Sequence, residues 1–270
     1  MKKDWIMNRL DEHLKKKSSN LLSVYFTAGY PGLDDTPDII QLLENNGADL
    51  IEIGMPFSDP MADGPVIQKS SSMALKNGMN LGLLFQQLAQ IRKSISIPLV
   101  LMGYLNPVYR FGMERFCRHC QETGIDGVIL PDLPLEVYHQ EFKELFDQYG
   151  LYNIFLVSPT TSENRLKKIV EASQGFVYMV SSTATTGDHI DVQSHIDYIR
   201  GIRSIRPDLP VLMGFGIDSH QKFRQVCAHA NGGIIGSAFI RALEKTGTLE
   251  GKIRGFMEEI QYDRYDYSTQ

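Results

Sequence analysis

Residues 47–53 read Gly-Ala-Asp-Leu-Ile-Glu-Ile, and this short stretch indicates how the chain is built. Gly47 is a residue type that ends helices, and the largely apolar residues 50–53 after it are typical of a buried strand. The same arrangement returns at Gly124-Ile125-Asp126 and at Asn231-Gly232-Gly233. Each copy predicts the end of a helix followed directly by entry into the next strand.

The strand candidates are short apolar runs that repeat along the chain, and the segments between them have helical periodicity. The predicted strands are residues 22–27, 50–53, 99–102, 127–130, 153–157, 176–180, 211–214 and 233–235. The predicted helices are residues 36–46, 71–77, 82–93, 114–123, 135–149, 162–172, 194–205 and 219–229, after a first helix that ends at the lysines 15–17. Continuous rather than alternating apolar strands are typical of a parallel sheet covered by helices.

Eight strands with crossover helices, one after another without a linker or a break in composition, favour a closed (β/α)₈ TIM barrel. We expect one α/β domain over residues 1–270, with an N-terminal helix in front of the barrel. An open Rossmann sheet would call for a Gly-x-Gly-x-x-Gly turn after the first strand, and residues 28–32, Ala-Gly-Tyr-Pro-Gly, do not match it.

The composition excludes several classes of protein. The 270 residues are 43% hydrophobic, enough for a sizeable core, and a net charge of -5 gives no support to a nucleic-acid partner. No apolar stretch is long enough for a membrane span, and no signal-type core follows the start. Cys117 and Cys120 have metal-like spacing, but no second pair completes a zinc site. We expect free thiols on a helix and a cytoplasmic location.

The segment 52–64, Glu-Ile-Gly-Met-Pro-Phe-Ser-Asp-Pro-Met-Ala-Asp-Gly, carries the most chemical information. Glu52 lies within an apolar strand, where an unpaired charge would cost several kcal/mol. The Gly- and Pro-rich loop after it brings back a second carboxylate, Asp63. Two acids in different surroundings can hold different pKa values and divide acid and base work. A structural ion pair or a loop cap is the alternative, and this segment alone leaves it open.

The loops after the last two predicted strands are candidates for a phosphate site, which barrels often form there. They contain Gly216 and the pair Gly236-Ser237, and glycine allows backbone N–H groups to approach an anion. The loop 181–188, with Thr186 and Gly187, is long enough to be a lid that also donates to the phosphate. The alternatives are plain tight turns and a surface loop without a role.

Three tyrosines, Tyr25, Tyr104 and Tyr178, fall at or near strand ends and suggest a pocket for a planar apolar ligand. Asp132, also at a strand end, is expected to be a structural cap. The histidines show no metal-ligand spacing, and His195 is expected on the surface of a helix. No lysine stands on a strand near the barrel mouth, which disfavours a Schiff-base aldolase.

Residues 52–65, with Gly-Phe-Gly-Ile at 214–217 and Gly-Ser-Ala at 236–238, resemble the tryptophan synthase alpha chain family. The resemblance extends from residue 26 to residue 237. It implies a (β/α)₈ lyase that cleaves indole-3-glycerol phosphate to indole and glyceraldehyde 3-phosphate, with no cofactor of its own and no metal. Glu52 and Asp63 match the two catalytic positions. The expected substrate-binding residues are Tyr25, Tyr104, Ile129, Tyr178, Thr186, Gly187, Phe215, Gly216, Gly236 and Ser237.

The resemblance also implies a partner, a beta chain that carries pyridoxal phosphate and forms an alpha2-beta2 heterotetramer. Asp59 matches a position that faces this partner. One departure concerns the lid, where the family pattern Ser-Arg-x-Gly-Val-Thr-Gly is replaced by Ser-Ser-Thr-Ala-Thr-Thr-Gly at 181–187. Ser182, Ala184 and Thr185 therefore put lid kinetics and partner contact in doubt.

The proposed reaction needs groups that the chain has. Breaking the bond between the indole ring and the glycerol is a retro-aldol step, in which Glu52 can move the protons while Asp63 stays ionised beside the indole N–H. Three alternatives remain at this stage: a stand-alone lyase that releases free indole, a non-catalytic phosphate-binding regulatory barrel, and an isomerase or epimerase of a sugar phosphate.

Overall fold

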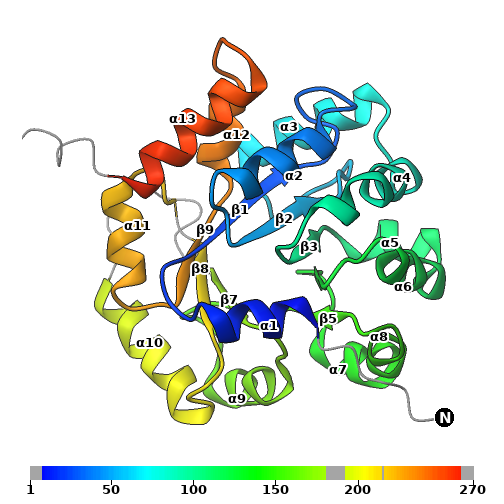
Figure 1. The fold of residues 1–270 in the computed structure, drawn as a ribbon. Helices are drawn as coiled ribbons and strands as arrows, with labels where there is room; N and C mark the ends of the chain where they lie inside the picture. Colours follow the sequence, from blue (N-terminus) through cyan, green and yellow to red (C-terminus); the bar gives the residue numbers. More distant parts are fainter. Residues whose placement is uncertain (1–7, 181–191, 215, 263–270) are drawn as a thin grey trace, which may run out of the picture.

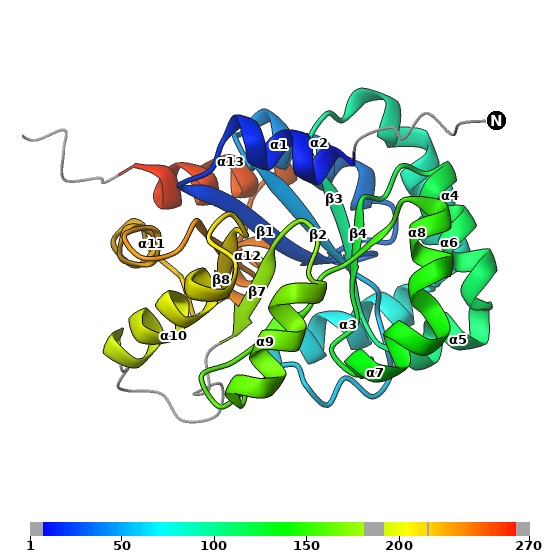
Figure 2. The ribbon, with the colours of Figure 1, turned by 90° about the horizontal axis from the view of Figure 1, so that it is seen from below.

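A single sheet of nine parallel strands, curled on itself, forms the centre of the protein in the computed structural model (Figures 1 and 2). The structure describes residues 8–180, 192–214 and 216–262. Helices surround the sheet, and α1 (Arg9–Lys16) lies across one end of it (Figure 2). The fold is therefore the helix-wrapped parallel barrel that the alternating pattern predicts.

The described elements follow one another as strand and helix. The strands are β1 (Leu21–Thr27), β2 (Leu50–Gly54), β3 (Leu99–Met102), β4 (Gly127–Ile129), β5 (Tyr152–Asn153), β6 (Leu156–Val157), β7 (Val177–Val180), β8 (Val211–Gly214) and β9 (Gly232–Ile235). The helices after α1 are α2 (Thr36–Asn45), α3 (Pro65–Asn77), α4 (Leu81–Ile91), α5 (Leu105–Phe111), α6 (Met113–Glu122), α7 (Leu135–Val137), α8 (Lys143–Tyr149), α9 (Glu163–Ala172), α10 (Val192–Ile205), α11 (His220–Cys227), α12 (Ser237–Leu243) and α13 (Leu249–Gln261). A 3₁₀ turn, η1 (Arg92–Ser94), follows α4, and a π turn, η2 (Tyr138–Phe142), joins α7 to α8.

The predicted fifth strand, residues 153–157, is two short strands in the structure. The sheet order is β5-β4-β3-β2-β1-β9-β8-β7-β6, so β5 and β6 stand at its two ends. The chain between them closes the barrel, because Ile154 N–H donates to the Val128 carbonyl at 2.9 Å while the Phe155 carbonyl accepts from Tyr178 N–H at 3.0 Å. One segment thus pairs first with β4 and then with β7.

The apolar residues form two cores. The inner core fills the barrel with side chains from every strand, among them Leu50, Val100 and Leu212, and α1 closes one end of it with Leu10 and Leu14. The larger outer core lies between the strands and the helices. Since successive strand residues point to opposite sides, the position of a residue along its strand decides which core it enters.

The repeated Gly-x-Asp phrase has a structural reason at the end of the barrel that α1 covers. Asp49 accepts from Leu22 N–H at 2.7 Å, and Asp126 accepts from Leu99 N–H at 2.9 Å. Asn231 does the same for Val211 N–H at 3.0 Å. Each of these residues precedes a strand and binds the N–H at or near the start of the neighbouring one. The hydrogen bonds at this end therefore hold neighbouring strands together. In barrels of this kind the active site lies at the opposite end.

Several details differ from the prediction. Helix α3 begins at Pro65 rather than at residue 71, and α5 and α13 were not predicted. The expectation that His195 lies on the surface is wrong, because only 5% of it is exposed and it packs inward on α10. Cys117 and Cys120 are free and buried on α6, as expected, and Cys227 is also free.

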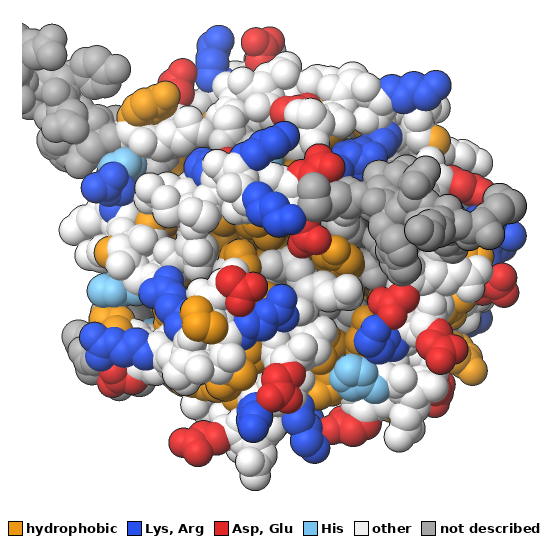
Figure 3. Space-filling view, turned by 60° about the horizontal axis from the view of Figure 1, so that its bottom comes forward, with side chains coloured by type: hydrophobic (Ala, Val, Ile, Leu, Met, Phe, Trp, Pro, Cys, Tyr) orange, Lys and Arg blue, Asp and Glu red, His pale blue; other side chains and the backbone are white. Residues whose placement is uncertain are grey.

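The outer surface carries mixed charge. Figure 3 shows lysines and arginines interspersed with acidic side chains over one face, with small apolar areas between them. None of the helices in the described ranges is both long and apolar enough to cross a bilayer.

Candidate active site

Glu52 lies on β2 with its side chain inside the barrel and is completely buried. Its backbone pairs in register with Tyr25 of β1. Ser23 Oγ donates a hydrogen bond to Glu52 Oε1 at 2.8 Å, whereas Oε2 has no partner within the described residues. Burial raises the pKa of Glu52 to about 7, although the bond from Ser23 acts in the opposite direction. The carboxyl can therefore gain or lose a proton near neutral pH.

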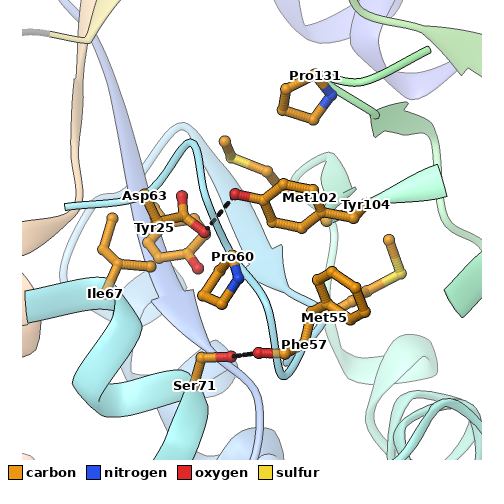
Figure 4. Close-up of a pocket in the computed structure, with 11 residues that line it drawn as sticks. Tyr25, Met55, Phe57, Pro60, Asp63, Ile67, Ser71, Met102, Tyr104 and Pro131 are labelled. Atoms are coloured by element: carbon orange, nitrogen blue, oxygen red, sulfur yellow. Dashed lines mark hydrogen bonds between the residues drawn. The ribbon is translucent and has the colours of Figure 1, made fainter. Parts of the chain in front are cut away.

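Asp63 lies in the loop that connects β2 to α3, at the open end of the barrel. Tyr104 Oη donates to Asp63 Oδ2 at 3.1 Å and accepts from Ala62 N–H at 3.0 Å (Figure 4). Partial burial raises the pKa of Asp63, and the bond from Tyr104 opposes this rise. Tyr104 thus fixes both the loop and the orientation of its carboxylate.

Helix α3 and an aromatic contact hold further residues of the β2–α3 loop in place. Ser71 Oγ accepts from Phe57 N–H at 2.9 Å and donates to the Phe57 carbonyl at 3.0 Å. The Gln68 amide donates to the Asp63 carbonyl at 2.8 Å. The rings of Phe57 and Tyr104 lie 5.2 Å apart between centroids. These contacts place Asp63 above the barrel interior.

Two tyrosines fill the barrel next to Glu52, and two glycines make room for them. A Cβ atom at Gly54 would lie 2.3 Å from Tyr25 Oη, and one at Gly214 would lie 2.4 Å from Tyr178 Oη. Both distances are too short for any larger residue. Burial, together with the charges of Glu52 and Asp63, raises the pKa of both phenols, so Tyr25 and Tyr178 stay neutral around the two acids.

A pocket opens beside these residues at the end of the barrel away from α1. Figure 4 shows its lining of mainly apolar and aromatic side chains, with Asp63 and the hydroxyl of Tyr104 hydrogen-bonded to each other in its wall. The lining residues are Tyr25, Met55, Phe57, Pro60, Asp63, Ile67, Ser71, Met102, Gly103, Tyr104 and Pro131. Glu52 is not one of them and lies deeper on β2. An apolar pocket with one acid in its wall and another beneath suits a flat, largely apolar ligand.

The structure brings together Tyr25, Glu52, Asp63, Tyr104 and Tyr178. Ile129 is fully buried in the inner core and does not line the pocket. Thr186, Gly187 and Phe215, and with them the expected lid 181–188, lie outside the described residues.

The glycines of the expected phosphate site lie in the loops after β8 and β9. Gly216 has φ +39°, in the left-handed region that favours glycine. Gly236 precedes α12, whose first residue is Ser237. Since β8 and β9 are neighbours in the sheet, their two loops leave the barrel side by side.

Two further acidic residues, Asp132 and Asp59, lie outside the pocket. Asp132 accepts from Leu105 N–H at 2.9 Å through Oδ1, which caps the first turn of α5 as predicted. Asp59 is exposed in the β2–α3 loop and accepts from the Ser58 hydroxyl.

Sequence reasoning missed Ser23, Phe57 and Ser71. A signal for Ser23 was present, because it stands two residues before Tyr25 on one strand and therefore points to the same side. The contacts of Phe57 and Ser71 depend on where α3 begins, which the periodicity placed six residues too late.

Comparison with known proteins gives a consistent result. The family model of the tryptophan synthase alpha chain matches residues 12–264. The tryptophan synthase alpha chain of Christiangramia forsetii is 49% identical over 256 residues, which cover 94% of this chain and 99% of that protein. The corresponding protein of Flavobacterium johnsoniae is 50% identical over 258 residues, with 94% and 100% covered.

Solved structures agree with the sequence relatives. The tryptophan synthase alpha chain from Legionella pneumophila superposes with a TM-score of 0.85 at 32% identity and covers 98% of this chain and 100% of its own. The aminoacrylate-bound form of tryptophan synthase from M. tuberculosis gives a TM-score of 0.84 at 30% identity, with 94% and 98% covered.

The raised pKa of Glu52 makes stability depend on pH. Between the ordinary value of 4.5 and about 7, the folded chain holds a proton that the unfolded chain has lost, so the parent loses stability as pH rises through this window. The Glu52→Gln variant has no charge to bury, so its stability does not fall in this pH window. In urea unfolding, the variant should gain on the parent by up to about 3 kcal/mol between pH 5 and pH 8.

Asp59→Asn is the matched control, since it removes one carboxylate from the exposed loop and should show no comparable gain. A Glu52→Gln stability difference that is the same at both pH values would contradict the burial-driven pKa.

Proposed function

The chain belongs to the tryptophan synthase alpha chain family, and from this premise we propose that Glu52 and Asp63 carry out its reaction. That reaction is the cleavage of indole-3-glycerol phosphate, a lyase step of tryptophan biosynthesis. The observation that carries the proposal is the buried Glu52 on the strand that leads to the pocket: one of its oxygens has no partner among the described residues, and its pKa is about 7. The 270 residues would act as one barrel domain.

In the first step Glu52 acts as an acid. A protonated Glu52 gives its proton to the ring carbon that bears the glycerol chain, so a C–H bond forms and the ring nitrogen takes on positive charge. Asp63, ionised and fixed by Tyr104, stabilises that charge at the indole N–H. The neutral phenols of Tyr25 and Tyr178 lie beside Glu52 and add no charge to the site.

In the second step Glu52 acts as a base. Its carboxylate takes the proton of the glycerol hydroxyl next to the ring, and the oxygen's electron pair forms the aldehyde. The bond between ring and glycerol breaks, and its electron pair restores the aromatic ring and neutralises the nitrogen. Indole and glyceraldehyde 3-phosphate leave with Glu52 protonated again, so one carboxyl serves both steps without a cofactor.

The phosphate is proposed to bind at the loops after β8 and β9, with Gly216, Gly236 and Ser237 as backbone or hydroxyl donors. The support is that the two loops leave adjacent strands at the barrel end that holds Asp63. Gly236 also lies next to Tyr25, because a Cβ there would be 3.3 Å from the tyrosine ring. A substrate with its phosphate at Gly236 would extend towards the pocket. Thr186, Gly187 and Phe215 remain proposed contacts from outside the described residues.

A beta chain is the proposed partner, in an alpha2-beta2 heterotetramer that docks at the open end of the barrel. The support is strong exposure of apolar side chains: Met61, in the β2–α3 loop at that end, is 92% exposed, and Tyr109 on α5 is 66% exposed. Exposed apolar side chains of this size mark interaction surfaces when they gather on one face. Asp59, close to Met61, would lie in the same contact. We also propose a cytoplasmic location, because all three cysteines are free.

Of the alternatives, a sugar-phosphate isomerase fits poorly because its substrate has no flat apolar part to fill this pocket. A stand-alone lyase has the same site, and only the dependence of turnover on a beta chain distinguishes it.

Glu52→Gln should lower kcat for indole release by about two to four orders of magnitude, the usual contribution of a positioned acid–base group. KM should change little, because the amide keeps the shape of the side chain. Steady-state indole formation from indole-3-glycerol phosphate measures both constants. A folded Glu52→Gln variant with parental kcat would disprove the assigned role.

Met61→Glu should weaken binding of a purified beta chain at least tenfold by placing a charge in the apolar contact. Met73→Glu on α3, where the methionine is 37% exposed, is the control and should bind as the parent does. Calorimetric titration gives both affinities. Equal affinities for parent and Met61→Glu would place the contact elsewhere.

A further inference from the structure

Ser23 is a polar residue in an apolar place. It lies on β1, fully buried, and its side chain points into the barrel between those of Leu21 and Tyr25. The neighbouring inner-core residues, such as Leu50 and Val100, are aliphatic. A buried hydroxyl costs free energy unless it forms a hydrogen bond. Within the described part of the chain, the only hydrogen bond of this hydroxyl is the one to Glu52 Oε1 at 2.8 Å.

The bond divides the two oxygens of Glu52 into different roles. Oε1 is occupied by the hydroxyl of Ser23, and Oε2 has no partner in the described residues. A donor at Oε1 disfavours a proton there, which leaves Oε2 as the oxygen that carries the acid proton. We propose that Ser23 is a positioning residue that holds Glu52 by Oε1 and so directs Oε2 to exchange protons with the substrate. This inference rests on the proposed function, since it assigns a role within that reaction.

The same bond stabilises the charge that appears during the reaction. When Glu52 has given up its proton, it is a carboxylate in a fully buried site, and Ser23 then donates to a charged acceptor. Hydrogen bonds to charged groups contribute more than those to neutral groups. Ser23 therefore favours the state between the two steps over the starting acid, and this difference should appear in kcat rather than in substrate binding.

A change of Ser23 removes none of the other groups near Glu52. Among the described residues, the titratable groups that face it are Tyr25 from β1 and Tyr178 from β7, and Asp63 lies in the loop at the open end of the barrel. From β3, Val100 and Met102 add only apolar contacts. A change of pH dependence in a Ser23 variant can thus be assigned to the lost hydroxyl.

The test compares Ser23→Ala, which removes the hydroxyl, with Ser23→Thr, which retains it. For Ser23→Ala, kcat for indole release should fall about 10- to 100-fold at pH 6, with KM within about threefold of the parent. The alkaline limb of kcat/KM, set by deprotonation of Glu52, should move to higher pH by about one unit, because the carboxylate has lost its donor. Ser23→Thr should recover most of kcat and the parental limb.

Ser173→Ala is the matched control. Ser173 is also buried and donates one hydrogen bond, to the Ile169 carbonyl at 2.7 Å, but it lies at the end of α9 away from the pocket. The Ser173→Ala variant should be less stable than the parent but should keep the parental kcat and pH profile. If Ser23→Ala does not fold, Ser23→Cys, with a similar shape and only a weak donor, carries the same expectations.

The outcomes separate this inference from the proposed function. A parent chain that releases no indole, alone or with a beta chain, would overturn the function itself. An active parent, together with a folded Ser23→Ala or Ser23→Cys variant that keeps the parental kcat and alkaline limb, would overturn the role of Ser23 alone. A purely structural serine would lower the melting temperature without moving that limb.

Discussion

Burial of the Glu52 carboxyl inside the barrel is the physical constraint on which the site depends. No cation compensates it among the described residues, so its pKa rises towards neutrality instead of being held low. The surroundings respond to this one group: glycines at 54 and 214 admit two tyrosines beside it, and Ser23 supplies its single hydrogen bond. A carboxyl that would be a defect in an ordinary core can gain or lose a proton near neutral pH here, because burial without a counter-charge raises its pKa to about 7.

The barrel keeps stability and chemistry at opposite ends. At the end closed by α1, buried acids are paired: Asp49 binds Lys17 at 2.6 Å, and Asp126 binds Arg9 at 2.8 Å. At the other end, within the described part of the chain, Glu52 has no such partner, and the carboxylate of Asp63 has only the phenol of Tyr104. The paired acids hold strands together, whereas burial raises the pKa of Glu52 to about 7. The surroundings of a buried acid in this barrel therefore differ between the two ends, with a cation beside it at one end and none among the described residues at the other.

The sequence predicted the parts of the fold that depend on local patterns. Apolar runs located the strands, and the loop 52–64 located both acids. The sequence could not predict that residues 153–157 pair first with β4 and then with β7. The break in this predicted strand arises from the closing of the barrel, which no local pattern describes. Helix α13 carried a readable signal, since Leu249, Ile253, Phe256, Met257 and Ile260 recur at helical spacing. The bond between Ser23 and Glu52 depends on the register of two strands, which composition does not contain.

The central claim is that Glu52 exchanges a proton near neutral pH because it is buried without a counter-charge. A carbon-13 NMR titration of the side-chain carboxyl of Glu52 tests it directly, with the signal assigned by its absence in Glu52→Gln. A Glu52 buried without a counter-charge should titrate with a midpoint near pH 7, well separated from those of surface glutamates. A midpoint near 4.5 would show that the carboxylate is charged at neutral pH, and would contradict its role as the starting acid.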